Sequence, residues 1–162
     1  MIKVGDRLPE GKVRIKAEDG TATELTTAQL FGGKTVVLVG VPGAFTSTCH
    51  NAHIPQFIAN AEAFRGKGVD RVVVLAVNDH HVMKAWSEVL GGVGKGEFVA
   101  DGNGEYTRAL GLEVDLTVAG LGKRCKRFSA LVRDGVVATL NFEPDGSRSV
   151  EATGAATMLG QV

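Results

Sequence analysis

Cysteine, aromatic residues and net charge are all scarce in this chain. Only two of its 162 residues are cysteine, 6% are aromatic, and 18 basic side chains balance 18 acidic ones. Two cysteines far apart in the sequence predict neither a disulfide framework nor a zinc-knuckle pair. The balanced charge gives no overall field that would attract nucleic acid or a membrane surface.

Long hydrophobic runs are also missing. The run over residues 72–77 is among the longest, and it is far shorter than the ~20 residues that a membrane-spanning helix needs. The first six residues carry charge too early for a secretory signal and lack its apolar stretch. We therefore predict a cytoplasmic protein, with an organelle matrix as the alternative if a transit peptide has been removed.

The residues that are present predict one globular domain over 1–162. Hydrophobic residues make up 44% of the chain and charged residues 22%, which is ordinary for a globular protein of this length. Apolar and alternating patterns predict strands over 12–17, 21–25, 34–40, 71–77, 127–133 and 136–142. Helices are expected over 48–65, 80–90, 105–110 and 155–160, with Asp79 as an N-cap and Asp134-Gly135 as a hairpin turn.

The order of these elements predicts an α/β fold. Strands that alternate with helices in the middle of the chain require crossovers and a parallel centre, and the last hairpin adds antiparallel strands. We therefore expect a mixed central sheet flanked by helices.

Cys49 lies where strand 34–40 gives way to a helix. Behind it, apolar residues recur with the spacing of one helical face, at Ile54, Phe57, Ile58, Ala61 and Phe64. The unpaired N–H groups and the dipole of a helix start favour an anion, so a thiol there ionises readily and becomes a nucleophile. The alternative is a buried, inert cysteine.

The stretch around Cys49 resembles the active-site signature of the peroxiredoxins, Pro-x-x-x-Thr-x-x-Cys, here Pro42, Thr46 and Cys49. The wider string Val-Pro-Gly-Ala-Phe-Thr-x-Thr-Cys is similar to the type II, or atypical two-cysteine, subfamily. Further matches in the expected order carry the resemblance over nearly the whole chain: Val77-Asn78-Asp79, Val82-Met83, Trp86, Lys126-Arg127-Phe128-Ser129, Asp134-Gly135 and Glu143-Pro144-Asp145-Gly146.

This resemblance implies a thiol-dependent peroxidase with a thioredoxin fold and extra N-terminal strands, without cofactor or metal. It implies that Cys49 attacks the peroxide, Thr46 and backbone N–H groups bind it, Pro42 shields the sulfur and Arg127 supplies the permanent cation. From the residues alone, Thr46 would serve equally as a helix cap and Arg127 as an exposed strand arginine.

Other residues near the site are Gly43, Phe45, Thr48 and His53. The spacing of His50 and His53 after Cys49 raises the alternatives of a zinc site or a Cys–His hydrolase, but no second ligand pair or orienting partner is evident. The resemblance matches His53 to a packing or hydrogen-bonding residue beside the site. It also implies a homodimer that pairs through loops near the site, where Phe45 and Trp86 fall.

The chain differs from the subfamily that it resembles in the cysteine that would restore oxidised Cys49. Relatives carry a resolving cysteine in the stretch matching 150–153 or in the strand matching 73–75, and this chain has none there. Cys125 is the only other candidate. If Cys125 and Arg127 share one strand, they face the same side, and Cys125 lies too far from Cys49 for a disulfide without movement.

We therefore predict a one-cysteine mechanism with an external thiol. The basic cluster over residues 123–127 would suit an anionic thiol such as glutathione, with glutaredoxin or thioredoxin as further partners. Alternatively, the basic cluster is a solvated loop without a binding role. A nucleic-acid site is disfavoured because no aromatic residues that could stack on bases accompany the cluster. The alternative to the enzyme is a redox sensor with little turnover.

Overall fold

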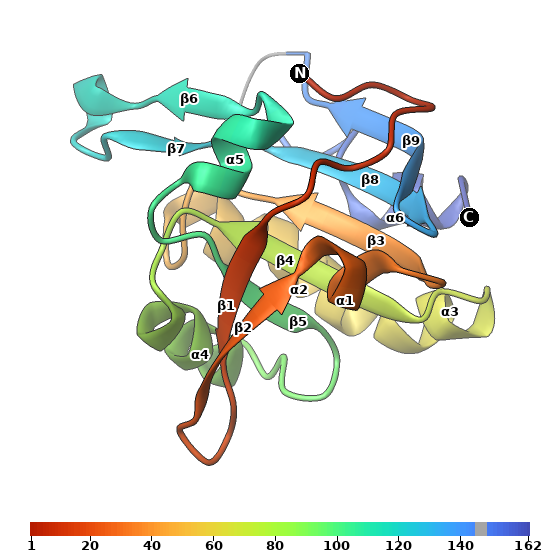
Figure 1. The fold of residues 1–162 in the computed structure, drawn as a ribbon, viewed down its shortest axis with the longest axis horizontal. Coiled ribbons are helices and arrows are strands. Elements are labelled where there is room, and N and C mark those ends of the chain that lie inside the picture. Colours follow the sequence, from red (N-terminus) through yellow and green to blue (C-terminus); the bar gives the residue numbers. More distant parts are fainter. Residues whose placement is uncertain (145–148) are drawn as a thin grey trace.

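The fold is built on a mixed sheet of seven strands with helices on both faces (Figure 1). The computed structural model of the chain describes residues 1–144 and 149–162. The strand order is β2-β1-β5-β4-β3-β8-β9. The bounds are β1 Lys12–Lys16, β2 Ala22–Thr26, β3 Thr35–Gly40, β4 Arg71–Ala76, β5 Glu97–Ala100, β8 Phe128–Arg133 and β9 Val136–Phe142.

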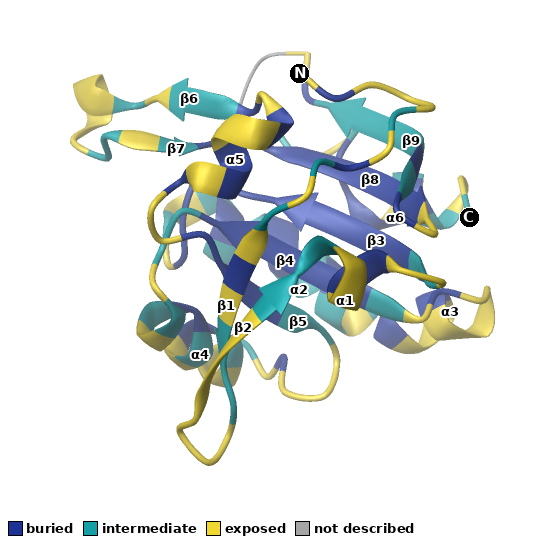
Figure 2. Ribbon diagram, viewed as in Figure 1, coloured by how far each residue is buried: buried dark blue, intermediate teal, exposed yellow. Residues whose placement is uncertain are grey.

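The centre of the sheet is parallel, as the sequence predicts. Strand β3 pairs in parallel with β4, and β4 pairs in parallel with β5. The hairpin of β8 and β9 joins the other edge of β3 antiparallel, and the hairpin of β1 and β2 reaches β5. The central strands are almost entirely buried, which explains their continuous apolar sequences (Figure 2).

Each face of the sheet has its own hydrophobic core. In β3, Val37 and Val39 belong to one core, and Val36 and Leu38 belong to the other, because successive side chains of a strand alternate. Helices α2 (Ile54–Ala59), α3 (Ala61–Gly66), α4 (His80–Val89) and α6 (Ala155–Leu159) cover the first core. Helices α1 (Thr27–Phe31) and α5 (Glu105–Leu110) and the N-terminal segment cover the second.

Apart from the helix expected over 48–65, the predicted elements are present, with small differences at their ends. The Asp79 carboxylate caps α4 by accepting the Val82 N–H at 2.8 Å, and Asp134 and Gly135 form the predicted turn with φ of 47° and 76°. The sequence patterns did not predict α1, β5 or the small hairpin of β6 (Glu113–Asp115) and β7 (Lys123–Cys125), whose tip holds the 3-10 turn Thr117–Ala119. Figure 1 shows this hairpin projecting from the body.

The single helix expected over 48–65 is wrong in detail, because the structure divides it. A π-helical turn, Cys49–His53, precedes α2, and Asn60 separates α2 from α3. Pro55 has no N–H to donate, and the N–H of Ile54 bonds the carbonyl of Cys49 five residues back. At the break, the Gln56 carbonyl accepts both the side chain of Asn60 at 2.8 Å and its backbone N–H at 3.1 Å.

Candidate active site

The segment after β3 carries the predicted site and is tied to the neighbouring strand. The N–H of Val41 donates to Leu75 O at 3.0 Å, and the N–H of Ala44 donates to the side chain of Asn78 at 2.9 Å. Asn78 belongs to one of the motifs that carry the resemblance. Pro42 and Gly43, which lie between the two bonded residues, are buried. The bonds fix where the next helix begins.

Cys49 lies in the first turn of the helical stretch that begins at Ser47, as predicted. It is the first residue of the π-helical turn, it is fully buried, and its thiol is free. Thr48 adds no side-chain cap to this turn. The sulfur is therefore a single thiol at a helix start, enclosed by protein.

Arg127 reaches the sulfur of Cys49. Its Nη2 donates to Cys49 Sγ at 3.2 Å, and the residue is only 4% exposed. The alternative of an exposed strand arginine is wrong, and so is the strand expected to start at residue 127. Strand β7 ends at Cys125 and β8 starts at Phe128, so Arg127 lies between them.

His53 lies on the other side of the same guanidinium. Its Nδ1 is 2.6 Å from Arg127 Nη1, and its Nε2 is 2.9 Å from the Thr153 carbonyl oxygen. Burial lowers the pKa of His53 to about 4, with the nearby Arg127 charge acting in the same direction. His53 is therefore neutral near pH 7. Its Nδ1 faces a guanidinium rather than the sulfur, which disfavours both the hydrolase and the zinc alternatives.

Glu143 organises the segment to which His53 is bonded. It is 6% exposed and accepts the N–H groups of Glu151, Ala152 and Thr153 and the hydroxyls of Ser149 and Thr153. Partial burial acts to raise the pKa of this carboxyl, but the hydrogen bonds from Thr153 and its neighbours outweigh it and lower the pKa. Glu143 is part of a motif used for the resemblance, whose Asp145 and Gly146 lie outside the described residues.

Thr46 and Pro42 are close to Cys49 in sequence, and Pro42 is also bonded to the basic cluster. The Thr46 hydroxyl donates to Gly43 O at 2.7 Å, so its proton is used and its lone pairs remain to accept. It does not cap the helix. Arg124 Nη1 donates to Pro42 O at 3.4 Å, and a Cβ on Gly43 would lie only 2.8 Å from that nitrogen. Gly43 therefore allows the Arg124 guanidinium to approach the loop.

Phe45 is the exposed edge of the site. It has a left-handed backbone with φ of 63°, the residue is 47% exposed, and its ring is stacked on His50 with the ring centroids 5.6 Å apart. Trp86 is fully buried beneath it and donates its Nε1–H to His50 Nδ1 at 3.0 Å. Of these two residues, Phe45 is thus the one that an interface in this region could use, because α4 packs Trp86 into the core.

Cys125 belongs to the core on the opposite face of the sheet from Cys49. It is fully buried, its Sγ–H donates to Lys126 O at 3.3 Å, and burial raises its pKa to about 12. The expectation that Cys125 and Arg127 share one strand is wrong. Cys125 is the last residue of β7, and Arg127 lies beyond the end of that strand. Cys125 is thus a free thiol in apolar surroundings.

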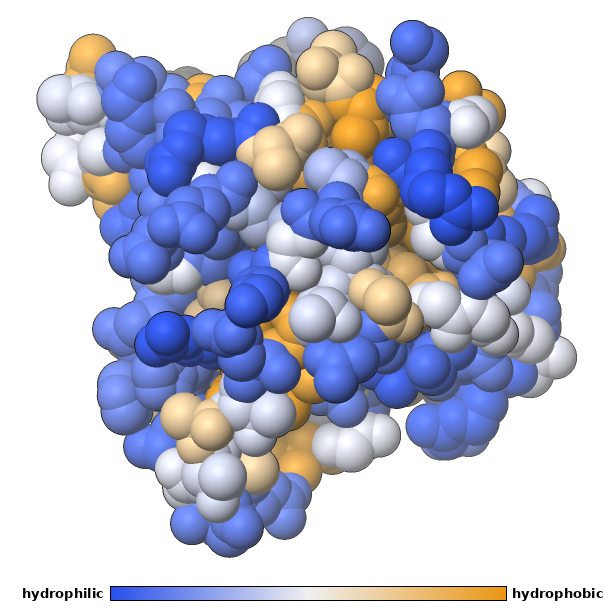
Figure 3. Space-filling view, viewed as in Figure 1, coloured by the Kyte–Doolittle hydropathy of each residue, from blue (hydrophilic) through white to orange (hydrophobic). Residues whose placement is uncertain are grey.

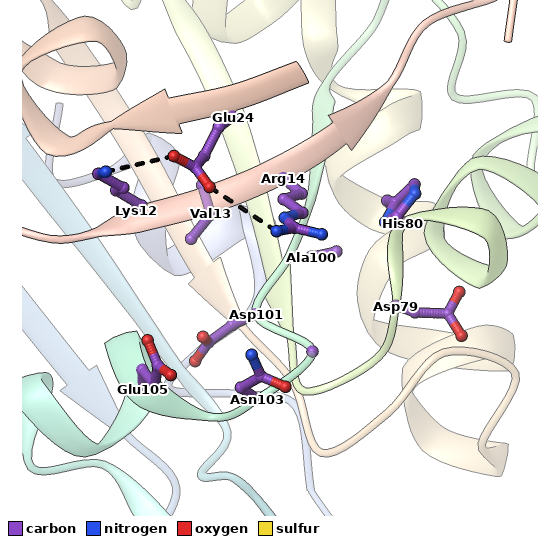
Figure 4. A pocket seen from close by; sticks show the side chains of 11 residues that line it. Lys12, Val13, Arg14, Glu24, Asp79, His80, Ala100, Asp101, Asn103 and Glu105 are labelled. Atoms are coloured by element: carbon purple, nitrogen blue, oxygen red, sulfur yellow. Dashed lines mark ion pairs between the residues drawn. The ribbon is translucent and has the colours of Figure 1, made fainter. Parts of the chain in front are cut away.

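A polar hollow of about 320 Å³ lies elsewhere, beside β1 and α5 (Figure 4). Glu24 forms ion pairs there with Lys12 and Arg14. Asp101 points its carboxylate at the N–H groups of Tyr106 and Thr107, so it fixes the start of α5. In the described part of the chain no three His, Cys, Asp or Glu side chains are placed to hold a metal ion.

Comparison with known proteins decides the family. The Redoxin family model matches residues 3–159. Peroxiredoxin-2B of Arabidopsis thaliana is 44% identical over 93% of each chain. The chain belongs to the redoxin family and is a peroxiredoxin, a thiol-dependent peroxidase. The predicted fold, a thioredoxin-like peroxiredoxin fold, is also confirmed.

The solved structures that match nearly the whole chain include the following two. Reduced Prx3 from Vibrio vulnificus in complex with H2O2 has a TM-score of 0.92 at 40% identity and covers 99% of both chains. The 1-Cys peroxiredoxin of Plasmodium falciparum has a TM-score of 0.90 at 26% identity and covers 97% of this chain and 96% of its own. Other relatives are named as chloroplastic and mitochondrial forms, so the cytoplasmic location stays a prediction. Across the described residues no helix is long and apolar enough to cross a membrane.

Proposed function

We propose that this peroxiredoxin reduces hydrogen peroxide and alkyl hydroperoxides at Cys49 and is then restored by an external thiol. The observation that carries the proposal is the contact of Arg127 Nη2 with Cys49 Sγ at 3.2 Å inside the buried loop of the signature. A fixed cation that cannot lose its proton favours the thiolate and later the departing oxygen.

The first step is a displacement on oxygen. The Cys49 thiolate attacks the terminal oxygen of ROOH, the S–O bond forms and the O–O bond breaks. The sulfur becomes a sulfenic acid, and the alkoxide leaves as ROH after taking one proton from solvent. Because the Thr46 proton is directed to Gly43 O, Thr46 Oγ1 is suited to accept the O–H of the incoming peroxide.

The second step uses a thiol from outside the chain. An RSH molecule attacks the sulfenic sulfur, forming a mixed disulfide at Cys49 and releasing water, and a further thiol frees Cys49 as RSSR departs. Three observations support this route: relatives' resolving positions hold no cysteine here, Cys125 lies in the other core, and burial raises the pKa of its thiol to about 12. A solved relative is named a 1-Cys peroxiredoxin.

The external thiol must gain access to a sulfur that is fully buried. The π-helical turn at Cys49–His53 would have to open for a molecule the size of glutathione to reach it. Glutathione is the favoured thiol because its net negative charge suits the exposed Lys126. Lys123, which is also exposed, is ion-paired with Glu113 at 3.7 Å. Arg124 joins this cluster to the loop of Pro42. Glutaredoxin would release the mixed disulfide, with thioredoxin as the alternative reductant.

We further propose a homodimer through the region of Phe45. The exposed ring is apolar and sits beside the site, and its unfavourable backbone conformation is held by packing on His50.

Steady-state peroxide consumption tests the proposal, with glutathione, glutathione plus glutaredoxin, and thioredoxin offered separately. We expect turnover with glutathione plus glutaredoxin, and none in Cys49→Ser, which keeps the size of the side chain. Substantial consumption by Cys49→Ser would remove Cys49 from the mechanism. Rapid oxidation of Cys49 without turnover with any reductant would instead favour the redox sensor.

A further inference from the structure

A chain of hydrogen bonds runs from the C-terminal segment to the sulfur of Cys49. Glu143 accepts the N–H and the hydroxyl of Thr153 at 2.7 and 2.5 Å, and the Thr153 carbonyl is 2.9 Å from His53 Nε2. His53 Nδ1 meets Arg127 Nη1, and Arg127 Nη2 meets Cys49. We call these contacts the His53 relay. All five residues are buried.

The partners of His53 determine its tautomer. A carbonyl oxygen can only accept, so Nε2 must carry the proton that it donates to Thr153. A guanidinium can only donate, so Nδ1 must be the unprotonated acceptor of the Arg127 N–H. Protonating Nδ1 would place two donors face to face at 2.6 Å and a second cation beside the guanidinium. The geometry therefore requires neutral His53 with its proton on Nε2.

We propose that His53 is a positioning residue that holds the Arg127 guanidinium in place, so that one of its nitrogens is aimed at the sulfur of Cys49. The inference rests on the proposed function of Cys49. Glu143 and Thr153 extend the relay, because they fix the carbonyl that sets the orientation of the imidazole ring. Among the described residues, the charged groups that face this ring are Arg127 and Glu143. The contribution of His53 is thus made through Arg127, without contact between His53 and the peroxide.

Two substitutions test the roles of the two ring nitrogens of His53 separately. His53→Asn places an amide oxygen near the position of Nδ1, so it keeps the acceptor for Arg127 and loses the bond to Thr153. His53→Gln places an amide nitrogen near the position of Nε2, so it keeps the bond to Thr153 and loses the acceptor. His81→Asn is the matched control, because His81 is exposed on α4 and lies outside the relay.

The measurements are the second-order rate of Cys49 oxidation by hydrogen peroxide and the pH dependence of Cys49 alkylation by iodoacetamide. We expect His53→Gln to lower the oxidation rate at least tenfold and to move its alkylation profile to higher pH. His53→Asn should keep most of the rate, and His81→Asn all of it. Equal losses in the Asn and Gln variants, or wild-type behaviour in both, would overturn the proposal.

If neither variant folds, a measurement on the wild type still tests which nitrogen of His53 carries the proton. Long-range ¹H–¹⁵N spectra of the wild type between pH 8 and 5 should show His53 protonated on Nε2 alone. A proton on Nδ1 in this range would also overturn the proposal. Neither the spectra nor the alkylation profile needs turnover, so a wild type that fails to consume peroxide would refute the proposed function and leave the test of His53 intact.

Discussion

At Arg127, one guanidinium contacts two buried partners that come from different parts of the described chain. Its planar, forked donors allow Nη1 to meet His53 while Nη2 meets Cys49. A lysine ammonium carries the same charge on a single nitrogen and cannot span both partners in this way. The geometry of the side chain therefore contributes separately from its charge.

Arg127→Ala and Arg127→Lys measure these two contributions. We expect Arg127→Ala to slow Cys49 oxidation by roughly 10²–10³-fold, because a buried donor and cation at the developing charge are both lost. Arg127→Lys should recover part of this loss and no more. Stopped-flow oxidation by hydrogen peroxide measures both, and a wild-type rate in Arg127→Ala would remove Arg127 from the site.

Cys125 provides the residue-scale test of the one-cysteine route. Its burial in the opposite core predicts that Cys125→Ser turns over at a near wild-type rate with glutathione plus glutaredoxin. Mass spectrometry of peroxide-treated wild type with glutathione should find the adduct on Cys49. A stoichiometric Cys49–Cys125 disulfide, with turnover lost in the variant, would show instead that Cys125 resolves.

At the scale of elements, sequence patterns locate the long, apolar or well-capped segments. Strand β9 and helix α5 have the predicted bounds, and β3 and β4 differ by one residue at one end. Strand β5 has only four residues, and α1 has only five, too few for a period to show. The π-helical turn depends on Pro55 and on tertiary packing, which the apolar spacing of the sequence does not reveal. Periodicity alone therefore predicts one continuous helix.

The sequence predicts the residues of the candidate site that belong to its signature or to the family resemblance, but not the contacts that surround them. Cys49, Thr46, Pro42 and Arg127 follow from the signature motif and the family resemblance. The relay through His53 depends on Thr153, which is 100 residues away in the chain and contributes a backbone carbonyl. A backbone group has no sequence signal. Glu143 was visible only as part of a motif, and its role becomes clear from the five groups it binds.

Gly40 gives a prediction about how β3 packs on β8. A Cβ at Gly40 would lie 2.1 Å from Phe128 Cε1, in the second core. Gly40→Ala should therefore lower the free energy of unfolding by about 1–3 kcal/mol, as overpacking of a dense core does. Gly66→Ala is the matched control, because nothing lies within 4 Å of its added Cβ and its helical position favours alanine. Urea unfolding measures both, and equal stability of the two variants would contradict the packing at Gly40.

At the scale of the whole molecule, the face seen in Figure 3 is mainly polar. Figure 3 shows hydrophilic residues over most of one face, with hydrophobic ones in smaller patches between them. The proposed dimer would use Phe45, which is apolar and 47% exposed. We expect Phe45→Lys to shift the protein toward monomer in sedimentation at micromolar concentration, while Val89→Lys, at another exposed apolar side chain, leaves its mass unchanged. A monomeric wild type would contradict the dimer.

The stability of the molecule should fall in mild acid because of His53. The folded-state pKa, about 4, lies below the ordinary 6.5, so the unfolded chain binds a proton that the native chain excludes. The contribution is complete above pH 6.5, is lost as the pH falls from 6.5 toward 4, and amounts to about 2 kcal/mol between pH 7.5 and 5. The lowered pKa of Glu143 acts in the same direction, mainly below pH 4.5.

His53→Asn isolates this contribution. We expect the variant to be less stable than wild type at pH 7.5, but to lose about 2 kcal/mol less than wild type between pH 7.5 and 5, because asparagine does not titrate. Urea unfolding at the two pH values measures the difference, and His81→Asn, which removes an exposed histidine, should follow the wild type. Equal losses in wild type and His53→Asn would mean that His53 is protonated in the native state at pH 5, and the buried neutral imidazole required by its contacts with Arg127 and Thr153 would be wrong.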